Sequence, residues 1–74
     1  MNAYIVKGSE DGNLGVYSSM KKAMIAAKEY VANADDLDVN ATDFDIGYFC
    51  DGDLINVACE YSWVTADIEK FKVK

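Results

Sequence analysis

The chain has 74 residues and a net charge of −6 at pH 7, and about half of its residues are apolar. This length supports one small core, and so a single domain over residues 1–74, while the apolar content excludes a disordered chain. Histidine, arginine, glutamine and proline are absent, so every basic residue is a lysine and nucleophilic triads that need histidine are excluded.

The N-terminal segment predicts a β-hairpin. Residues 3–8 are rich in β-branched and aromatic types, residues 9–12 favour a turn, and residues 14–17 resume the apolar pattern. We expect a three-residue loop over residues 10–12, with Gly12 in the left-handed conformation. The residues predicted to share one face of this hairpin are Tyr4, Val6, Leu14 and Val16.

The next segment predicts an amphipathic helix that runs to about Asn33. Ser18 or Ser19 can cap it, because a serine oxygen accepts a hydrogen bond from an unpaired N–H group of the first turn. The apolar residues recur at helical spacing. The predicted buried stripe comprises Met20, Met24, Ala27, Val31 and Ala34, with Ala23 and Tyr30 at its flank. Ile25 lies outside the stripe, and we expect it to be exposed.

A second hairpin gives the strongest signal. Asp51 and Gly52 favour a type I′ turn, which would join strands over residues 42–50 and 53–64. The predicted core face comprises Phe44, Ile46, Tyr48, Ile55, Val57, Cys59, Tyr61 and Trp63. The predicted solvent face comprises Asp43, Asp45, Gly47, Phe49, Leu54, Asn56, Ala58, Glu60 and Ser62. Because a slip of one residue would exchange these faces, burial fixes the register.

The C-terminal segment predicts one helical turn capped by Thr65, over residues 66–69, followed by a fifth strand. Residues 70–74 alternate with period two, so Phe71 and Val73 would point inward and the lysines outward, as on an edge strand. The expected fold class is α+β: a single domain with an antiparallel sheet of four to five strands and one helix on one face, in the order ββαββ with a further C-terminal strand.

The two cysteines are predicted to be buried free thiols. Cys59 would lie opposite Phe44, six residues along the strand from Cys50, which is about 20 Å at 3.3 Å per residue. A disulfide needs α-carbons within about 7 Å of each other. We therefore expect no disulfide within the chain.

Carboxylates are the main candidates for catalysis. Asp43 would face Glu60 across the second hairpin, with Asp45 on the same face, and close carboxylates can share a proton. The chain is too short to enclose a cleft around them, and it has no arginine to bind a polar substrate. We therefore expect no enzymatic activity.

A calcium loop is the nearest match to a metal site. Asp36, Asp38 and Asn40 match the first three ligand positions of an EF-hand loop. Ala41 stands where the loop requires glycine, and Gly47 stands where it requires a bidentate glutamate. We expect no metal and no cofactor.

The charge is concentrated in the middle of the chain. Between Glu29 and Glu69 there are many carboxylates and no lysine, so direct binding of nucleic acid, which rests on lysine and arginine contacts, is not expected. No apolar run reaches the roughly 18 residues of a membrane span, and the N-terminus lacks the pattern of a signal peptide. We expect a cytoplasmic protein.

This acidity predicts a docking surface for a basic protein. Like charges on one sheet face are destabilising, which favours a functional reason for them, although solubility alone is the alternative. The candidate protein-binding residues are Asp35, Asp36, Asp38, Asp43, Asp45 and Glu60, with Phe49 and Leu54 as apolar anchors. A partner that binds nucleic acid would place these carboxylates at phosphate positions, which would make the protein a nucleic-acid mimic. The other hypothesis is a structural protein that forms a homo-oligomer through a sheet edge or exposed apolar residues.

The run from Tyr4 to Val31 carries a resemblance. Its YIVKG strand, SEDG turn, GVYS strand and helix rich in lysine and alanine resemble the opening hairpin and helix of small uncharacterised proteins of tailed bacteriophages and prophages. The similarity covers about two-fifths of the chain. It implies a phage-encoded inhibitor or modulator acting in the host cytoplasm, and it assigns no functional residue.

Overall fold

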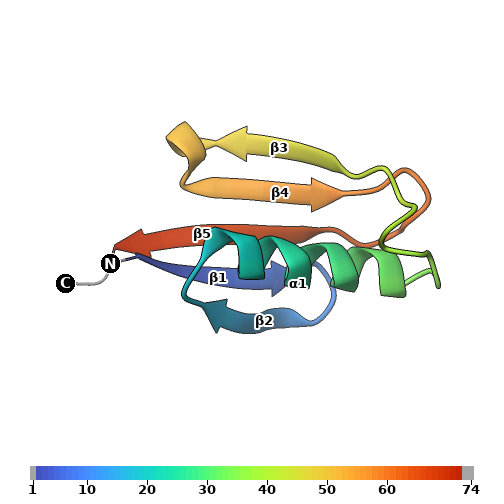
Figure 1. Ribbon diagram of the computed structural model, residues 1–74, viewed down its shortest axis with the longest axis horizontal. Helices are drawn as coiled ribbons and strands as arrows, with labels where there is room; N and C mark the ends of the chain where they lie inside the picture. Colours follow the sequence, from blue (N-terminus) through green and yellow to red (C-terminus); the bar gives the residue numbers. More distant parts are fainter. Residues whose placement is uncertain (1, 73–74) are drawn as a thin grey trace.

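A five-stranded antiparallel sheet with one helix packed on one face forms the molecule (Figure 1). The computed structural model describes residues 2–72. In chain order the elements are β1 (Asn2–Gly8), β2 (Gly12–Tyr17), α1 (Met20–Asn33), β3 (Asp45–Phe49), β4 (Leu54–Ala58) and β5 (Ala66–Lys72). The strands lie in the order β2, β1, β5, β4 and β3. The predicted α+β class with a fifth, C-terminal strand is confirmed.

The helix α1 begins and ends close to where the sequence predicts. The Ser19 Oγ accepts a hydrogen bond from the Lys22 N–H at 3.2 Å, so Ser19, and not Ser18, is the N-cap. The fully buried residues of the helix are Ala23, Ala27, Val31 and Ala32. Three of the four are alanines, which let α1 lie close to the sheet. Ala34 was predicted to be buried and is exposed, because the helix ends at Asn33.

The strand β5 is central, with β1 on one side and β4 on the other. The predicted helical turn over residues 66–69 and the predicted edge position are therefore wrong. Ala66 and Ile68 are buried against α1 and the neighbouring strands, so this segment is extended and inward-facing at alternate residues. Phe71 was predicted to point inward but lies on the opposite face, 47% exposed. Val73 lies outside the described residues.

The first hairpin forms with a loop one residue earlier than predicted, over residues 9–11. Gly12 has the expected positive φ of 72°. A bulge between Val6 and Lys7 shifts the pairing, so Tyr4 lies opposite Tyr17. The bulge reverses which face later side chains occupy. Val16, predicted to be in the core, is therefore 61% exposed.

The second hairpin has the predicted register, with Tyr48 opposite Ile55 and Ile46 opposite Val57. Its turn also has the predicted shape, because Asp51 has φ 57° and ψ 31° and Gly52 has φ 92°, as in a type I′ turn. Cys50 has a positive φ of 55° and leaves the extended conformation. The two strands are therefore shorter than predicted.

The core lies between α1 and strands β1, β5 and β4. Ile55, Val57 and Cys59 are buried as predicted, and Phe44 and Ile46 are half-buried. Three residues predicted to be in the core are exposed instead: Tyr48 at 66%, Tyr61 at 74% and Trp63 at 66%. Tyr48 lies on the edge strand β3, which α1 does not cover (Figure 1). Tyr61 and Trp63 follow the end of β4, where the inward and outward alternation stops.

Candidate functional site: the acidic end and the outer sheet face

The six predicted binding carboxylates gather at one end of the molecule, which we call the acidic end. The linker from α1 to β3 and the loop from β4 to β5 meet there (Figure 1). The acidic end comprises Asp35, Asp36, Asp38, Asp43, Asp45 and Glu60, all of which are exposed. Asp38, Asp43 and Glu60 line one hollow of about 410 Å³. Asp43 and Glu60 thus share this hollow, but they do not form the predicted cross-strand pair, because the β-ladder ends two pairs before them, at Asp45 and Ala58.

The linker over residues 34–44 is ordered by its own polar groups. The Asp38 carboxylate accepts a hydrogen bond from the Asn40 N–H at 2.9 Å, and the Thr42 hydroxyl donates to the Asp38 carbonyl at 2.6 Å. The Leu37 N–H donates to the Ala32 carbonyl at 2.9 Å, which fixes the linker to the end of α1. The spacing that resembles a calcium loop is thus used to form turns. In the described part of the chain, no group of three or more Cys, Asp or Glu side chains could hold a metal ion.

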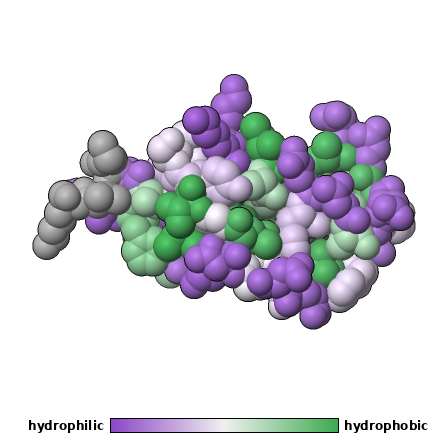
Figure 2. All heavy atoms as spheres, turned by 90° about the horizontal axis from the view of Figure 1, so that it is seen from below, coloured by the Kyte–Doolittle hydropathy of each residue, from purple (hydrophilic) through white to green (hydrophobic). Residues whose placement is uncertain are grey.

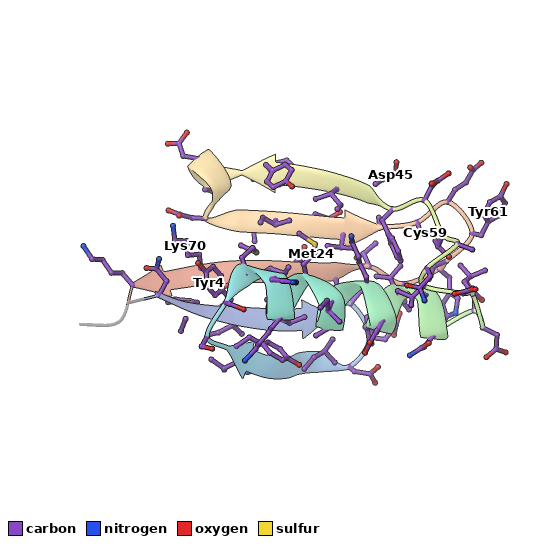
Figure 3. All side chains as sticks on the ribbon, in the orientation of Figure 1. Tyr4, Met24, Asp45, Cys59, Tyr61 and Lys70 are labelled. Carbon is purple, nitrogen blue, oxygen red and sulfur yellow. The ribbon has the colours of Figure 1, made fainter. Side chains whose placement is uncertain are left out.

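Two exposed aromatic side chains, Tyr61 and Trp63, stand beside these carboxylates. The main-chain N–H of Trp63 donates to the Asp35 carboxylate at 3.1 Å, and the Ser62 hydroxyl donates to the Val31 carbonyl at 2.7 Å. These bonds anchor the loop between β4 and β5 to the end of α1. Figure 3 shows Tyr61 at the same end of the molecule as Asp45, directed away from the core.

The sequence pattern did not identify these aromatics as surface residues, because period-two alternation continued through them. The length of the predicted strand was one signal that could have identified them. The predicted second strand covered residues 53–64, whereas strands usually have about five or six residues. An earlier strand end would have released Tyr61 and Trp63 from the core face.

The sheet face turned away from α1, which we call the outer face, carries both apolar and charged side chains. The register places a single row of residues across all five strands: Val16, Ile5, Glu69, Leu54 and Phe49. Glu69 is paired with Lys7 at 3.0 Å, and Asp67 accepts a hydrogen bond from the Asn56 amide at 2.8 Å. Figure 2, which views the molecule from the β2 side, shows hydrophobic side chains at the surface among the hydrophilic ones.

The predicted site therefore divides into two surfaces. Phe49 and Leu54 lie opposite each other on the outer face, as predicted. Asp45 is the predicted carboxylate that lies within a strand. It stands at the other end of β3, about 13 Å from Phe49 at 3.3 Å per residue. The expected single sheet face that carries both the carboxylates and the apolar anchors does not form, because Asp43 and Glu60 lie in loops beyond the strands.

The charges at the ends of α1 oppose the helix dipole. Lys21 and Lys22 stand in its first turn, and Asp35 and Asp36 follow its last residue. The positive end of a helix dipole is at the N-terminus, so both placements are unfavourable, each by about 0.3–1 kcal/mol at low salt. These charges therefore reduce the stability of α1 slightly.

The cysteines differ in exposure. Cys59 is buried at the edge of the core, and Cys50 is exposed in the turn between β3 and β4, although both were predicted to be buried. Both are free thiols. The left-handed backbone at Cys50 takes its side chain out of the sheet.

Comparison of the chain with family models, curated proteins and solved structures finds no match. No helix in residues 2–72 has the length and apolar character needed to cross a membrane. The functional argument therefore rests on the two surfaces described above.

Proposed function

We propose that this protein is a non-enzymatic binding protein whose acidic end docks onto a basic surface of another protein. The observation that carries the proposal is the position of Trp63. Trp63 is 66% exposed, while its main-chain N–H is fixed by the hydrogen bond to the Asp35 carboxylate within the acidic end. Tryptophan and tyrosine are enriched among the residues that dominate binding energy at protein interfaces, so Trp63 and Tyr61 replace Phe49 and Leu54 as the proposed anchors.

The carboxylates supply charge complementarity. Every carboxylate of the acidic end is exposed, which suits recognition of a positive surface and does not suit proton transfer in an enclosed site. A basic surface of this kind is typical of proteins that bind nucleic acid, where the carboxylates would take phosphate positions. An inhibitor or modulator encoded by a bacteriophage, acting in the host cytoplasm, would use such a surface to block a host protein.

The test is capture of a partner from a bacterial lysate at low and high salt, followed by titration of the purified partner. We expect one basic protein, lost at high salt, whose binding shifts the fluorescence of Trp63 as its ring becomes buried. Trp63 is the single tryptophan of the chain, so its signal reports the acidic end directly.

Two variants and two matched controls separate charge from anchors. Asp43→Asn/Asp45→Asn/Glu60→Gln and Tyr61→Ala should each weaken binding at least tenfold. Asp51→Asn/Asp53→Asn removes two exposed charges from the turn between β3 and β4, away from the acidic end, and Tyr48→Ala removes an exposed aromatic side chain outside it. These controls should bind as the unmodified chain does. Equal weakening by the controls, or a partner insensitive to salt, would contradict the proposal.

A further inference from the structure

The two edges of the sheet differ in how well they are protected from pairing with another strand. The edge strand β2 is bulged, and its Gly15 N–H donates to the Asn13 side chain at 3.0 Å. Bulges, prolines and lysines are the usual devices that discourage edge pairing. The other edge strand, β3, has the sequence DIGYF, pairs with β4 in an unbroken register and carries none of these devices.

The alternation of hydrogen-bonded positions along the strands shows which main-chain groups of β3 do not bond to β4. The Lys70 N–H donates to the Asp53 carbonyl at 2.8 Å, so the pair Asp53 and Lys70 is a hydrogen-bonded position between the start of β4 and β5. Hydrogen-bonded positions alternate along an antiparallel pair, so the main-chain groups of Leu54 and Asn56 point toward β3. Their partners Phe49 and Gly47 point back toward β4.

The N–H and C=O groups of Ile46 and Tyr48 consequently point outward from the sheet. Tyr48 lies on the helix side of the sheet, where α1 does not cover β3, and is 66% exposed, while Phe49 lies on the outer face and is 53% exposed. The edge thus combines free main-chain groups with uncovered apolar side chains.

Going beyond the proposed function, we propose that two copies of this chain pair through β3, antiparallel and centred on Gly47. Ile46 of each copy then lies opposite Tyr48 of the other, and both pairs fall at hydrogen-bonded positions, so each exchanges N–H···O=C bonds in both directions. In the neighbouring antiparallel registers, only one of these two residues would form a hydrogen-bonded pair within β3. That pair would be either Ile46 with Ile46 or Tyr48 with Tyr48 of the second copy. The two Gly47 residues meet at the central position, where neither copy has a side chain of its own, and the Phe49 ring of each copy lies over its own Gly47.

The side chains also match across this register. On the helix side, Ile46 packs against Tyr48 of the second copy, an aromatic and β-branched pair that favours strand association. On the outer face, Asp45 lies opposite Phe49 of the second copy, so the carboxylates within β3 do not face each other. Because the copies run in opposite directions, their acidic ends lie at opposite ends of the dimer and both stay available to partners.

Charge distinguishes this dimer from the complex with a basic partner. Each copy carries −6, so salt should strengthen the dimer by screening, whereas salt should weaken the basic complex. Failure of one proposal is therefore separable from failure of the other.

The test uses sedimentation of the full chain over a range of concentrations at moderate salt. The informative variant is Tyr48→Pro, which removes an outward N–H that points away from β4 and has no partner among residues 2–72, and so is tolerated on an edge strand. Tyr48→Thr is the matched control, since it also loses the ring but keeps the N–H group. We expect a dimer for the unmodified chain, at least tenfold weaker association for Tyr48→Thr, and a monomer for Tyr48→Pro, with circular dichroism unchanged.

Amide hydrogen exchange gives a second readout that needs no variant. The N–H groups of Ile46 and Tyr48 should exchange quickly at low concentration and become protected at high concentration, whereas the Gly47 N–H, bonded to β4, should be protected throughout. A monomer at every concentration would overturn the proposal. So would a dimer that persists in Tyr48→Pro, or protection confined to β2.

Discussion

Gly8 lies directly against the Tyr30 side chain of α1. A Cβ atom at this position would lie 2.7 Å from Cε2 and 2.8 Å from Oη of Tyr30. The Tyr30 hydroxyl also accepts a hydrogen bond from the Glu10 N–H at 3.1 Å, so the ring is held in place over the end of β1. The backbone of Gly8 is not in the left-handed region, so its conformation does not require glycine. Glycine is required because the Tyr30 ring leaves no space for a side chain.

We therefore expect Gly8→Ala to lower the free energy of unfolding by about 1–3 kcal/mol, the usual range for overpacking. The measurement is urea denaturation. In a Tyr30→Ala background the same substitution should cost much less, since the obstructing ring is gone. An equal cost in both backgrounds would show that some other contact is responsible.

No sequence pattern could have identified this contact. Gly8 ends an apolar strand and precedes a turn, which is an ordinary place for glycine, and its partner lies on a helix twenty-two residues away in the chain. Burial of Ile55 and Val57, by contrast, follows from alternation alone. Trp63 lay beyond the last strand residue, where alternation no longer describes which side chains are buried.

Among the elements, α1 combines a good cap with unfavourable charges. Ser19 caps the helix, and Lys22 stands at the third helical position, where a glutamate side chain could bond back to the cap residue. Lys22→Glu should raise the free energy of unfolding by about 0.5–1 kcal/mol, from this reciprocal bond and from a better match to the helix dipole. Thermal unfolding followed by circular dichroism measures it. Lys21→Glu changes the same charge without the bond, and should stabilise less; an equal or larger gain for Lys21→Glu would exclude the reciprocal bond.

Local signals predicted the elements more accurately than their order in the sheet. Asp51 and Gly52 select their turn by their own backbone preferences, which is why the register of the second hairpin was correct. The central place of β5 depends on pairing with β1 and β4, far apart in the chain, and nothing within residues 66–72 encodes it. The lysines of this segment suggested an edge strand. Lys70 and Lys72 are exposed because they lie at the end of β5, beyond the buried residues Ala66 and Ile68.

At the scale of the whole molecule, charge is separated along the long axis, which measures 38 Å against 21 Å for the others. Because α1 and the strands run along this axis, Lys21 and Lys22 lie at the opposite end from the linker carboxylates, and Figure 3 shows Lys70 at the end opposite Asp45. The acidic end therefore concentrates like charges that the unfolded chain would separate. Such repulsion lowers stability and is screened by salt.

This arrangement predicts that neutralising the acidic end stabilises the fold. Asp43→Asn/Asp45→Asn/Glu60→Gln should raise the free energy of unfolding by about 1 kcal/mol at low salt, and the gain should disappear as salt screens the charges. Denaturation at two ionic strengths measures both effects. Asp53→Asn is the control, since Asp53 lines a hollow with Lys70 and Lys72, and removing it should stabilise nothing. A triple variant that is less stable than the unmodified chain would show that these carboxylates hold the linker together. A stabilised one, with binding lost, would show that the acidic end is retained for recognition at the expense of stability.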